Sequence, residues 1–153
     1  MHVYFVRHGE SEGNVAKVYQ GEDAVLSAQG IAQSSMLASR IKELPVDTII
    51  SSDLARARVT AEIIGDALKK EVMYVPLFRE LSLPNELIGL SFSHKKSVRI
   101  RKMRIANQDD PDWRYSNEEN FFDATARADD ALKVVEQLPS KRVIVVTHSH
   151  FVF

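Results

Sequence analysis

The sequence predicts an α/β fold, a three-layer α/β/α sandwich with a mainly parallel central sheet. Two observations lead to this prediction. Apolar runs of strand length alternate along the chain with segments of helical periodicity, an order typical of helices that flank a parallel sheet. The last apolar run, residues 143–146, is continuous rather than alternating, as expected for a strand that is covered on both faces.

The first half of the chain provides two strands and the helix between them. Residues 2–6 predict the first strand, and residues 48–50 predict the second. Ser27 is a suitable N-cap for a helix over residues 28–44, which Pro45 would end. The residues expected on the buried face of this helix are Ile31, Leu37, Ile41 and Leu44.

The later elements continue this alternation. Residues 54–69 predict a helix, residues 72–75 predict a third strand that Pro76 closes, and residues 118–138 predict the most regular helix. The last strand follows at residues 143–146. The buried face of the first of these helices is expected at Val59, Ile63, Ile64, Ala67 and Leu68, and that of the second at Phe121, Thr125, Ala128, Leu132 and Val135.

Length, charge and cysteine content narrow the possible functions. The 153 residues are expected to form a single domain, residues 1–153, with a core of its own. A net charge of −1 creates no overall field that would attract nucleic acid or an anionic membrane. The chain has no cysteine, which excludes disulfides, thiolate metal sites and cysteine nucleophiles. No secretory signal or membrane span is visible, so we expect a soluble cytoplasmic protein.

Residues 82–117 interrupt the alternation and predict a lid-like insertion over the sheet edge. The insertion contains a basic run at residues 94–104. This run is either a solvated helix face or a positively charged lid that draws anionic substrates toward a site beneath it. Selectivity for the substrate is expected in this insertion, including Trp113, Arg114 and Tyr115.

Residues that could form a site follow each of the four predicted strands. They are Arg7, His8 and Gly9 after the first, Ser51, Ser52 and Arg56 after the second, Arg79 and Glu80 after the third, and Thr147, His148 and Ser149 after the last. Together they bring two histidines, two or three arginines and one carboxylate to one edge of the sheet. In open α/β sheets, ligands bind beyond the carboxyl ends of the strands. We therefore expect these residues to converge on one site.

The chemistry that this set of residues favours is phosphoryl transfer. Guanidinium groups match phosphate oxygens bidentately, and an unprotonated imidazole can attack phosphorus. A carboxyl group can protonate a leaving alkoxide and later activate water. No cluster of metal-binding carboxylates accompanies these residues, so arginine and histidine would supply the positive charge.

Five blocks of sequence, in this order, resemble the histidine phosphatase superfamily, also called the phosphoglycerate-mutase-like family. They are Arg7-His8-Gly9-Glu10-Ser11 with Asn14; Tyr19-Gln20-Gly21-Glu22-Asp23 with Leu26-Ser27-Ala28-Gln29-Gly30; Ser51-Ser52-Asp53-Leu54-Ala55-Arg56-Ala57 with Thr60-Ala61; Arg79-Glu80-Leu81; and Val146-Thr147-His148. The blocks span nearly the whole chain. The resemblance implies a phosphoglycerate-mutase-like fold and hydrolysis without a metal or an organic cofactor.

The resemblance also implies a role for each matched residue. His8 would be the nucleophile that forms a phosphohistidine, and Glu80 would be the proton donor and then the base for water. The groups that would bind the phosphate are Arg7, Arg56 and His148, with Asn14 assisting, and Gln20 and Gly21 match positions near the substrate. Glu86 and Glu22 are alternatives for the acid. Arg58 is expected to be an exposed helix charge, His2 to have a structural role, and His94 and His150 to be non-catalytic.

The function best supported by the sequence is a metal-independent phosphatase that acts on a small phosphorylated substrate. A mutase is the first alternative, but mutases usually need longer insertions to exclude water from the intermediate. A regulatory phosphate-binding module is the second. A phosphatase of protein phosphohistidine is the third alternative. Glu80 argues against it, because such relatives tend to lack the acid.

The chain departs from the family pattern near its end. Ser149 and His150 follow the second histidine, where many relatives have glycine. The chain stops at Phe153, where relatives usually continue into a further helix. On this basis we expect the last strand to lie uncovered and the chain to self-associate, in the form of a homodimer.

Overall fold

The fold is built on a sheet of four strands that are all parallel. The computed structural model describes residues 1–152 of the chain. The strands are β1 (His2–Arg7), β2 (Thr48–Ser51), β3 (Val72–Tyr74) and β4 (Arg142–Thr147), in the spatial order β1-β4-β2-β3. Arg7 pairs with Thr147, and Ser51 pairs with Val146. The carboxyl ends of these strands therefore meet at one edge of the sheet.

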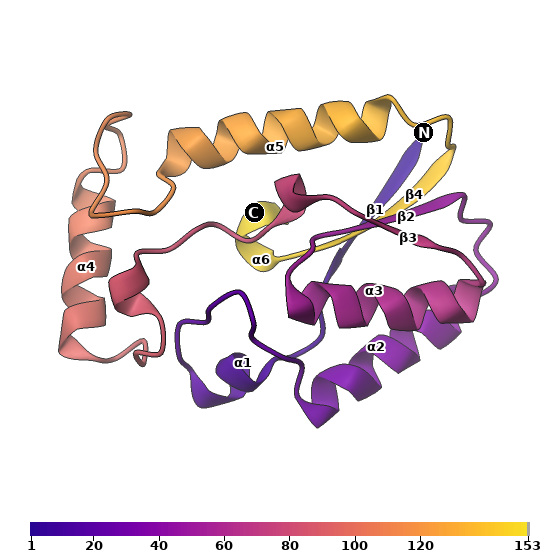
Figure 1. Ribbon diagram of the computed structural model, residues 1–153, viewed down its shortest axis with the longest axis horizontal. Coiled ribbons are helices and arrows are strands. Elements are labelled where there is room, and N and C mark those ends of the chain that lie inside the picture. The colour runs from indigo at the N-terminus through magenta and orange to yellow at the C-terminus, as the bar shows by residue number, and fades with distance from the viewer. Residues whose placement is uncertain (153) are drawn as a thin grey trace.

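Helices cover both faces of the sheet. The helices α2 (Ala28–Ile41) and α3 (Ala55–Leu68) lie on one face, and α5 (Phe121–Glu136) lies on the other (Figure 1). The central strand β4 contributes to both interfaces, because successive side chains of a strand point to opposite faces. Ile144 and Val146 pack with α2 and α3, whereas Val143 and Val145 pack with α5. This arrangement is the predicted three-layer α/β/α sandwich.

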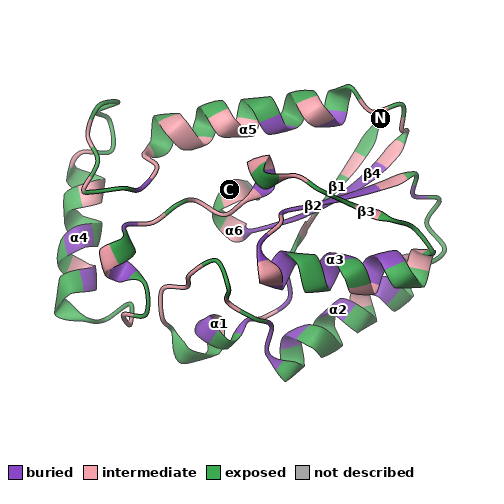
Figure 2. Ribbon diagram, viewed as in Figure 1, coloured by how far each residue is buried: buried purple, intermediate pink, exposed green. Residues whose placement is uncertain are grey.

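The last strand is the best covered of the four, which corrects the expectation that it would lie uncovered. β4 runs between β1 and β2, and its residues from Val143 to Thr147 are all buried (Figure 2). Apolar exposure occurs instead on the edge strand β1, where Tyr4 is 37% and Phe5 is 41% exposed. The side chains of residues 152 and 153, on which the expected self-association partly depends, lie outside the described residues. The homodimer stays a prediction.

The helix α2 buries small residues most deeply, and the predicted large ones only in part. Ser27 caps this helix as predicted, because its side chain accepts a hydrogen bond from the N–H of Gly30. Leu37 and Ile41 are partly buried and pack against the core as predicted, whereas Ile31 and Leu44 are exposed and the helix ends at Ile41. The buried residues of α2 are Gly30, Ser34 and Ala38. Small side chains allow α2 to approach its neighbours closely, so the apolar pattern alone misses the most buried positions.

The predictions for the other two long helices are confirmed in part. In α3, Ile64 is fully buried as predicted, whereas Val59 is exposed and the small residues Ala57 and Ala61 are fully buried instead. In α5, Val135 is buried as predicted together with Ala131, whereas Phe121 and Leu132 are exposed. The helices themselves were predicted to within three residues at each end.

The remaining elements surround the carboxyl ends of the strands. They are the short helices α1 (Glu12–Ala16) and α6 (Ser149–Val152), the 3₁₀ helices η1 (Pro76–Phe78) and η2 (Asn85–Leu87), and the basic helix α4 (Lys95–Ala106). The insertion carries α4 beyond the carboxyl ends of the strands rather than over a sheet edge (Figure 1). Within residues 1–152, none of the helices combines the length and the apolar character that crossing a bilayer requires.

Candidate active site

His8 is the first residue after β1, and its side chain is held in one orientation. Its N–H donates to the carbonyl oxygen of Thr147 on β4 (3.0 Å), so the backbone is still tied to the sheet at this point. The ring Nδ1 lies 2.6 Å from the carbonyl oxygen of Gly9. A carbonyl oxygen can only accept, so Nδ1 carries the proton and Nε2 carries the free lone pair. Such an imidazole is oriented for nucleophilic attack through Nε2.

The protonation state of His8 also suits a nucleophile. Its side chain is buried, with 7% of its surface exposed. The pKa of this imidazole is lowered to about 4. Burial is the largest cause, the cations of Arg56 and Arg7 act in the same direction, and the hydrogen bond with Gly9 partly opposes them. At neutral pH the ring is therefore unprotonated and its lone pair is available.

The turn after His8 depends on close packing against α2 and α3. A side chain on Gly9 would collide with the carbonyl oxygen of Gly30, the third residue of α2. The N–H of Gly9 donates to Oγ1 of Thr60 on α3 (3.1 Å), and Thr60 in turn donates to the carbonyl oxygen of Arg56 (3.0 Å). These contacts fix the strand end relative to the helix that carries the second arginine.

Arg56 is a buried cation that points toward the strand ends. It lies in the first turn of α3 and is only 4% exposed. Its Nη1 donates to the carbonyl oxygen of Gly21 (3.2 Å), while its Nε, within the described residues, is buried without a hydrogen-bond partner. Burial lowers the pKa of the guanidinium and Glu80 raises it, but arginine stays charged at neutral pH. A buried cation with an unused donor is suited to an anionic ligand.

The neighbouring Arg58 provides a contrast. Its side chain is exposed on the same helix and pairs with Glu62 at 3.7 Å, four residues further along. The prediction that this arginine is a surface charge is therefore confirmed.

His148 follows β4 directly and stands beside His8. Its side chain is completely buried, and the centroids of the two imidazole rings lie 5.1 Å apart. Nε2 of His148 lies 2.9 Å from Oγ of Ser52, and that oxygen already accepts from the N–H of Leu54, so its own proton is free for Nε2. Nδ1 would then carry the ring proton, and among residues 1–152 it has no hydrogen-bond partner. The pKa of His148 is lowered to about 2, mainly by burial and next by the positive charge of Arg56.

Three anchors position the segment that carries Glu80. Oγ1 of Thr147 donates to the carbonyl oxygen of Phe78 (2.7 Å). Nη1 of Arg127, on α5, donates to the carbonyl oxygens of Leu77 (2.8 Å) and Arg79 (2.9 Å). The backbone immediately before Glu80 is thus bonded to both the central strand and α5.

Arg79 itself belongs to the scaffold. Its guanidinium binds both carboxylate oxygens of Asp53, at 2.7 and 2.6 Å, and also contacts Glu22 at 3.3 Å. The sequence had left open whether a third arginine serves the site. Because Arg79 is already paired bidentately, Arg7 and Arg56 are the arginines that follow the strands and are left for an anion.

Glu80 is the carboxylate that shares a cavity with His8. Its Oε1 accepts from the N–H of Leu81 (3.1 Å), and its Oε2 lies 3.4 Å from Nδ1 of His150. Burial raises the pKa of Glu80, but the contacts with His150 and Leu81 and the charge of Arg56 outweigh it, so the pKa lies below its ordinary value. Glu80 is ionised at neutral pH before a substrate binds.

The two alternative acids are engaged elsewhere. Glu86 accepts from Oγ of Ser116 (2.8 Å) and does not line the cavity around His8. Glu22 is exposed and contacts Arg79. The geometry therefore favours Glu80.

Except for His148, which is fully buried beside His8, and Gly21, the predicted site residues line one cavity of 420 Å³, within the usual size of a ligand pocket. Its polar lining from the predicted set consists of Arg7, His8, Asn14, Gln20, Arg56 and Glu80. Oδ1 of Asn14 accepts from the backbone and side chain of Ser11, at 3.1 and 2.7 Å, which leaves its amide nitrogen for a ligand. Gly21 lines an adjoining cavity with Arg56 and serves the site through its carbonyl oxygen.

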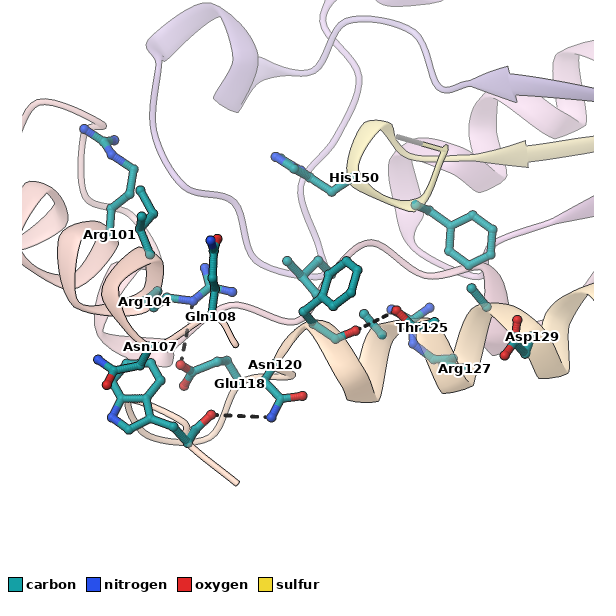
Figure 3. A pocket seen from close by; sticks show the side chains of 17 residues that line it. Arg101, Arg104, Asn107, Gln108, Glu118, Asn120, Thr125, Arg127, Asp129 and His150 are labelled. Carbon is teal, nitrogen blue, oxygen red and sulfur yellow. Dashed lines mark hydrogen bonds and ion pairs between the residues drawn. The ribbon is translucent and has the colours of Figure 1, made fainter. Parts of the chain in front are cut away.

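The insertion closes the far side of this cavity. Arg101 and Arg104 of α4 line the cavity together with Phe92 and Leu87. The same two arginines and His150 also line a second cavity of 580 Å³ between α4, α5 and α6 (Figure 3). Trp113 and Phe121 contribute apolar surface to this second cavity. Arg114 pairs with Asp123 at 2.6 Å, and the N–H of Tyr115 donates to Glu118.

Sequence reasoning missed several residues that shape the site. His150, which was expected to be non-catalytic, lines the cavity and contacts Glu80. Ser52 orients His148, and Arg127 anchors the segment before Glu80. The resemblance of Ser52 and Thr60 to the family blocks was visible, but nothing in the sequence assigned them these bonds. His2 is exposed on β1, and His94 caps α4.

Known proteins resemble this chain over nearly its whole length. The sequence profile of the histidine phosphatase superfamily (branch 1) matches residues 3–152. A probable phosphoglycerate mutase, GpmB, of Proteus mirabilis is 36% identical over 151 residues, which cover 97% of this chain and 69% of that protein.

Solved structures agree with this result. A mycobacterial glucosyl-3-phosphoglycerate phosphatase in complex with VO3 superposes with a TM-score of 0.79 at 26% identity, covering 97% of this chain and 75% of the other. A phosphoserine phosphatase mutant from Entamoeba histolytica, in complex with phosphoserine, gives a TM-score of 0.79 at 27% identity, covering 98% and 75%. The chain therefore belongs to the histidine phosphatase superfamily, in its branch 1.

Proposed function

We propose that this protein is a phosphatase that hydrolyses a phosphomonoester through a phosphohistidine on His8. The observation that carries the proposal is a neutral, oriented imidazole in the same cavity as two arginines and a carboxylate. Similar members of the superfamily are named as phosphatases or mutases, and both activities transfer a phosphoryl group.

In the first step, the lone pair on Nε2 of His8 attacks phosphorus and the bond from phosphorus to the leaving oxygen breaks. Arg7 and Arg56, which line the cavity, and the Nδ1–H of His148 would bind the three non-bridging phosphate oxygens, where negative charge accumulates. The carboxyl group of Glu80 gives its proton to the leaving alkoxide. The products of this step are a free alcohol and a phosphohistidine.

In the second step, Glu80 acts as the base. Its carboxylate takes a proton from water, the resulting hydroxide attacks phosphorus, and the bond between phosphorus and Nε2 breaks. Inorganic phosphate leaves, His8 returns to its neutral form, and Glu80 is again protonated. The hydrogen bond from Nδ1 to Gly9 stabilises the ring orientation through both steps.

Hydrolysis is favoured over mutase activity by the surroundings of His8. A mutase has to keep water from its phosphohistidine until the substrate has turned. Here the catalytic cavity shares lining residues with two further cavities, of 580 and 630 Å³, so water has room to reach the intermediate. The mutase reading is the second candidate, because the GpmB relatives are named as probable phosphoglycerate mutases.

A panel assay tests this proposal. The purified chain is given sugar phosphates, phosphoserine and a phosphoglycerate in the presence of EDTA, and released inorganic phosphate is measured together with isomerised substrate. We expect phosphate release from at least one ester, with EDTA having no effect. Isomerisation without release would establish the mutase, and loss of activity with EDTA would contradict the metal-independent mechanism.

A further inference from the structure

His150 is placed to act on the carboxylate that the mechanism uses. It is the second residue of α6, two positions after His148, and its Nδ1 lies 3.4 Å from Oε2 of Glu80. Figure 3 shows its ring extending from α6 toward the side of the cavity that α4 forms. His150 lines both the catalytic cavity and the second cavity, so it stands where the two meet.

The contact matters because Glu80 lacks a proton when it first needs one. The pKa of Glu80 lies below its ordinary value, and the hydrogen bond from His150 is the largest of the effects that lower it. The same contact raises the pKa of His150. When the pair holds a single proton, that proton therefore resides mostly on the imidazole, while the leaving group requires it on the carboxyl.

We propose that His150 and Glu80 form a pair that holds the proton for the leaving alcohol, with His150 acting through Glu80 as its positioning residue. The inference rests on the proposed function. In the first step, the proton moves from Nδ1 of His150 to Glu80, and Glu80 then passes it to the leaving oxygen. At the end of this step Glu80 is again a carboxylate and His150 is neutral. In the second step, Glu80 takes a proton from water, and the pair again holds one proton.

The charges around His150 determine how tightly the pair holds this proton. Arginines face His150 from three elements, Arg7 at the end of β1, Arg101 and Arg104 on α4, and Arg127 on α5. The anions on the same cavity walls are Glu80, Glu118 and Asp129. A bound phosphate would offset the cations around Arg7 and Arg56. Substrate binding would therefore favour the protonated pair.

The pH dependence of two substrates tests the inference. An alkyl phosphate needs a proton on its leaving group, whereas p-nitrophenyl phosphate does not. With the alkyl phosphate, kcat/KM of the wild type should persist above pH 6.5 and fall only as the pair loses its proton. In His150→Gln, Glu80 must hold the proton alone, so the fall should begin at lower pH. At pH 7.5 the loss should be about tenfold, within the range of general acid catalysis.

Two controls separate this role from a structural one. His94→Gln changes an exposed histidine at the start of α4, and its profile should match the wild type. With p-nitrophenyl phosphate, His150→Gln should lose less than about twofold, because nitrophenolate leaves without a proton. An equal loss with both substrates at every pH would overturn the inference and assign His150 a packing role.

A titration that does not depend on activity separates this inference from the proposed function. The His150 imidazole is followed by NMR in the wild type and in Glu80→Gln, which removes the partner charge but keeps the side-chain shape. We expect the pKa of His150 to be lower in the variant. An unchanged pKa would overturn the pair even in an active enzyme. If no ester is hydrolysed at all, the proposed function fails, and this titration still decides whether the pair shares a proton.

Discussion

The carboxyl ends of the strands and the insertion at residues 82–117 face each other across one cavity, yet they are built in opposite ways. At the strand ends, His8 and Arg56 are less than one-tenth exposed and His148 is fully buried, and backbone bonds to the sheet hold the chain around them. In the basic helix α4 of the insertion, only Ser97 and Ile100 are buried.

The attachment of α4 to the rest of the cavity wall is correspondingly slight. Arg101 contacts the hydroxyl of Tyr19 and the carbonyl oxygen of Phe92 at 3.5 Å each, and Arg104 pairs with Glu118 at 3.7 Å. This difference indicates a division of work. Under the proposed function, the buried strand ends would perform the chemistry and the exposed helix would select the leaving group, so substitutions in the two regions should have different kinetic effects.

Among variants other than those of His8, the largest effect is expected on α3. Arg56→Ala should lower kcat/KM by about 10²- to 10³-fold, because it removes a buried cation that would stabilise the negative charge developing on the phosphate in the transition state. Arg58→Ala is the matched control, since this arginine is two residues away on the same helix but exposed. Steady-state kinetics of both variants, with thermal unfolding to verify their folds, checks the prediction. Similar losses in the two would contradict the separation of site and surface.

A smaller and substrate-dependent effect is expected at Glu80. Glu80→Gln should lower kcat for an alkyl phosphate by about 10²-fold and leave p-nitrophenyl phosphate within a few-fold of the wild type. Glu86→Gln is the control, because Glu86 contacts Ser116 and does not line the cavity. Were Glu86→Gln to show the substrate-dependent loss instead, the acid would have to be reassigned.

The smallest effect is expected in the insertion. Arg101→Ala should raise KM for an anionic leaving group by about tenfold or less while kcat stays nearly constant, because the contact is the same in the ground and transition states. Lys102→Ala, the next residue on α4 and exposed, should change neither constant. A fall in kcat with an unchanged KM for Arg101→Ala would place this arginine in the chemical step.

The sequence predicted the order of strands and helices well but the buried helix faces only in part. Continuous apolar runs such as residues 143–146 identify strands because a central strand is covered on both faces. In the helices, however, Gly30, Ser34, Ala57 and Ala61 are buried while Ile31 and Val59 are exposed. Close approach between helices requires small residues, and a pattern based on hydrophobicity does not register that requirement.

The site was predictable where residues directly follow strands and unpredictable where a loop positions them. Arg7, His8 and His148 follow from the rule that ligands bind beyond the carboxyl ends of strands. The contact between His150 and Glu80 depends on the path of residues 76–80, which bonds to Thr147 and Arg127 determine. Such side-chain bonds to loop carbonyls have no periodic signature, so the pair became visible only in three dimensions.

The central claim is that His8 carries the phosphoryl group during turnover. The direct measurement is rapid quenching with a radiolabelled substrate, followed by peptide mapping of the labelled protein. Wild-type protein should hold phosphate on the peptide that contains His8, stable in alkali and lost in acid, and His8→Ala should hold none and should lose at least about 10³-fold in kcat. A catalytically active protein without this label, or an active His8→Ala variant, would contradict the account.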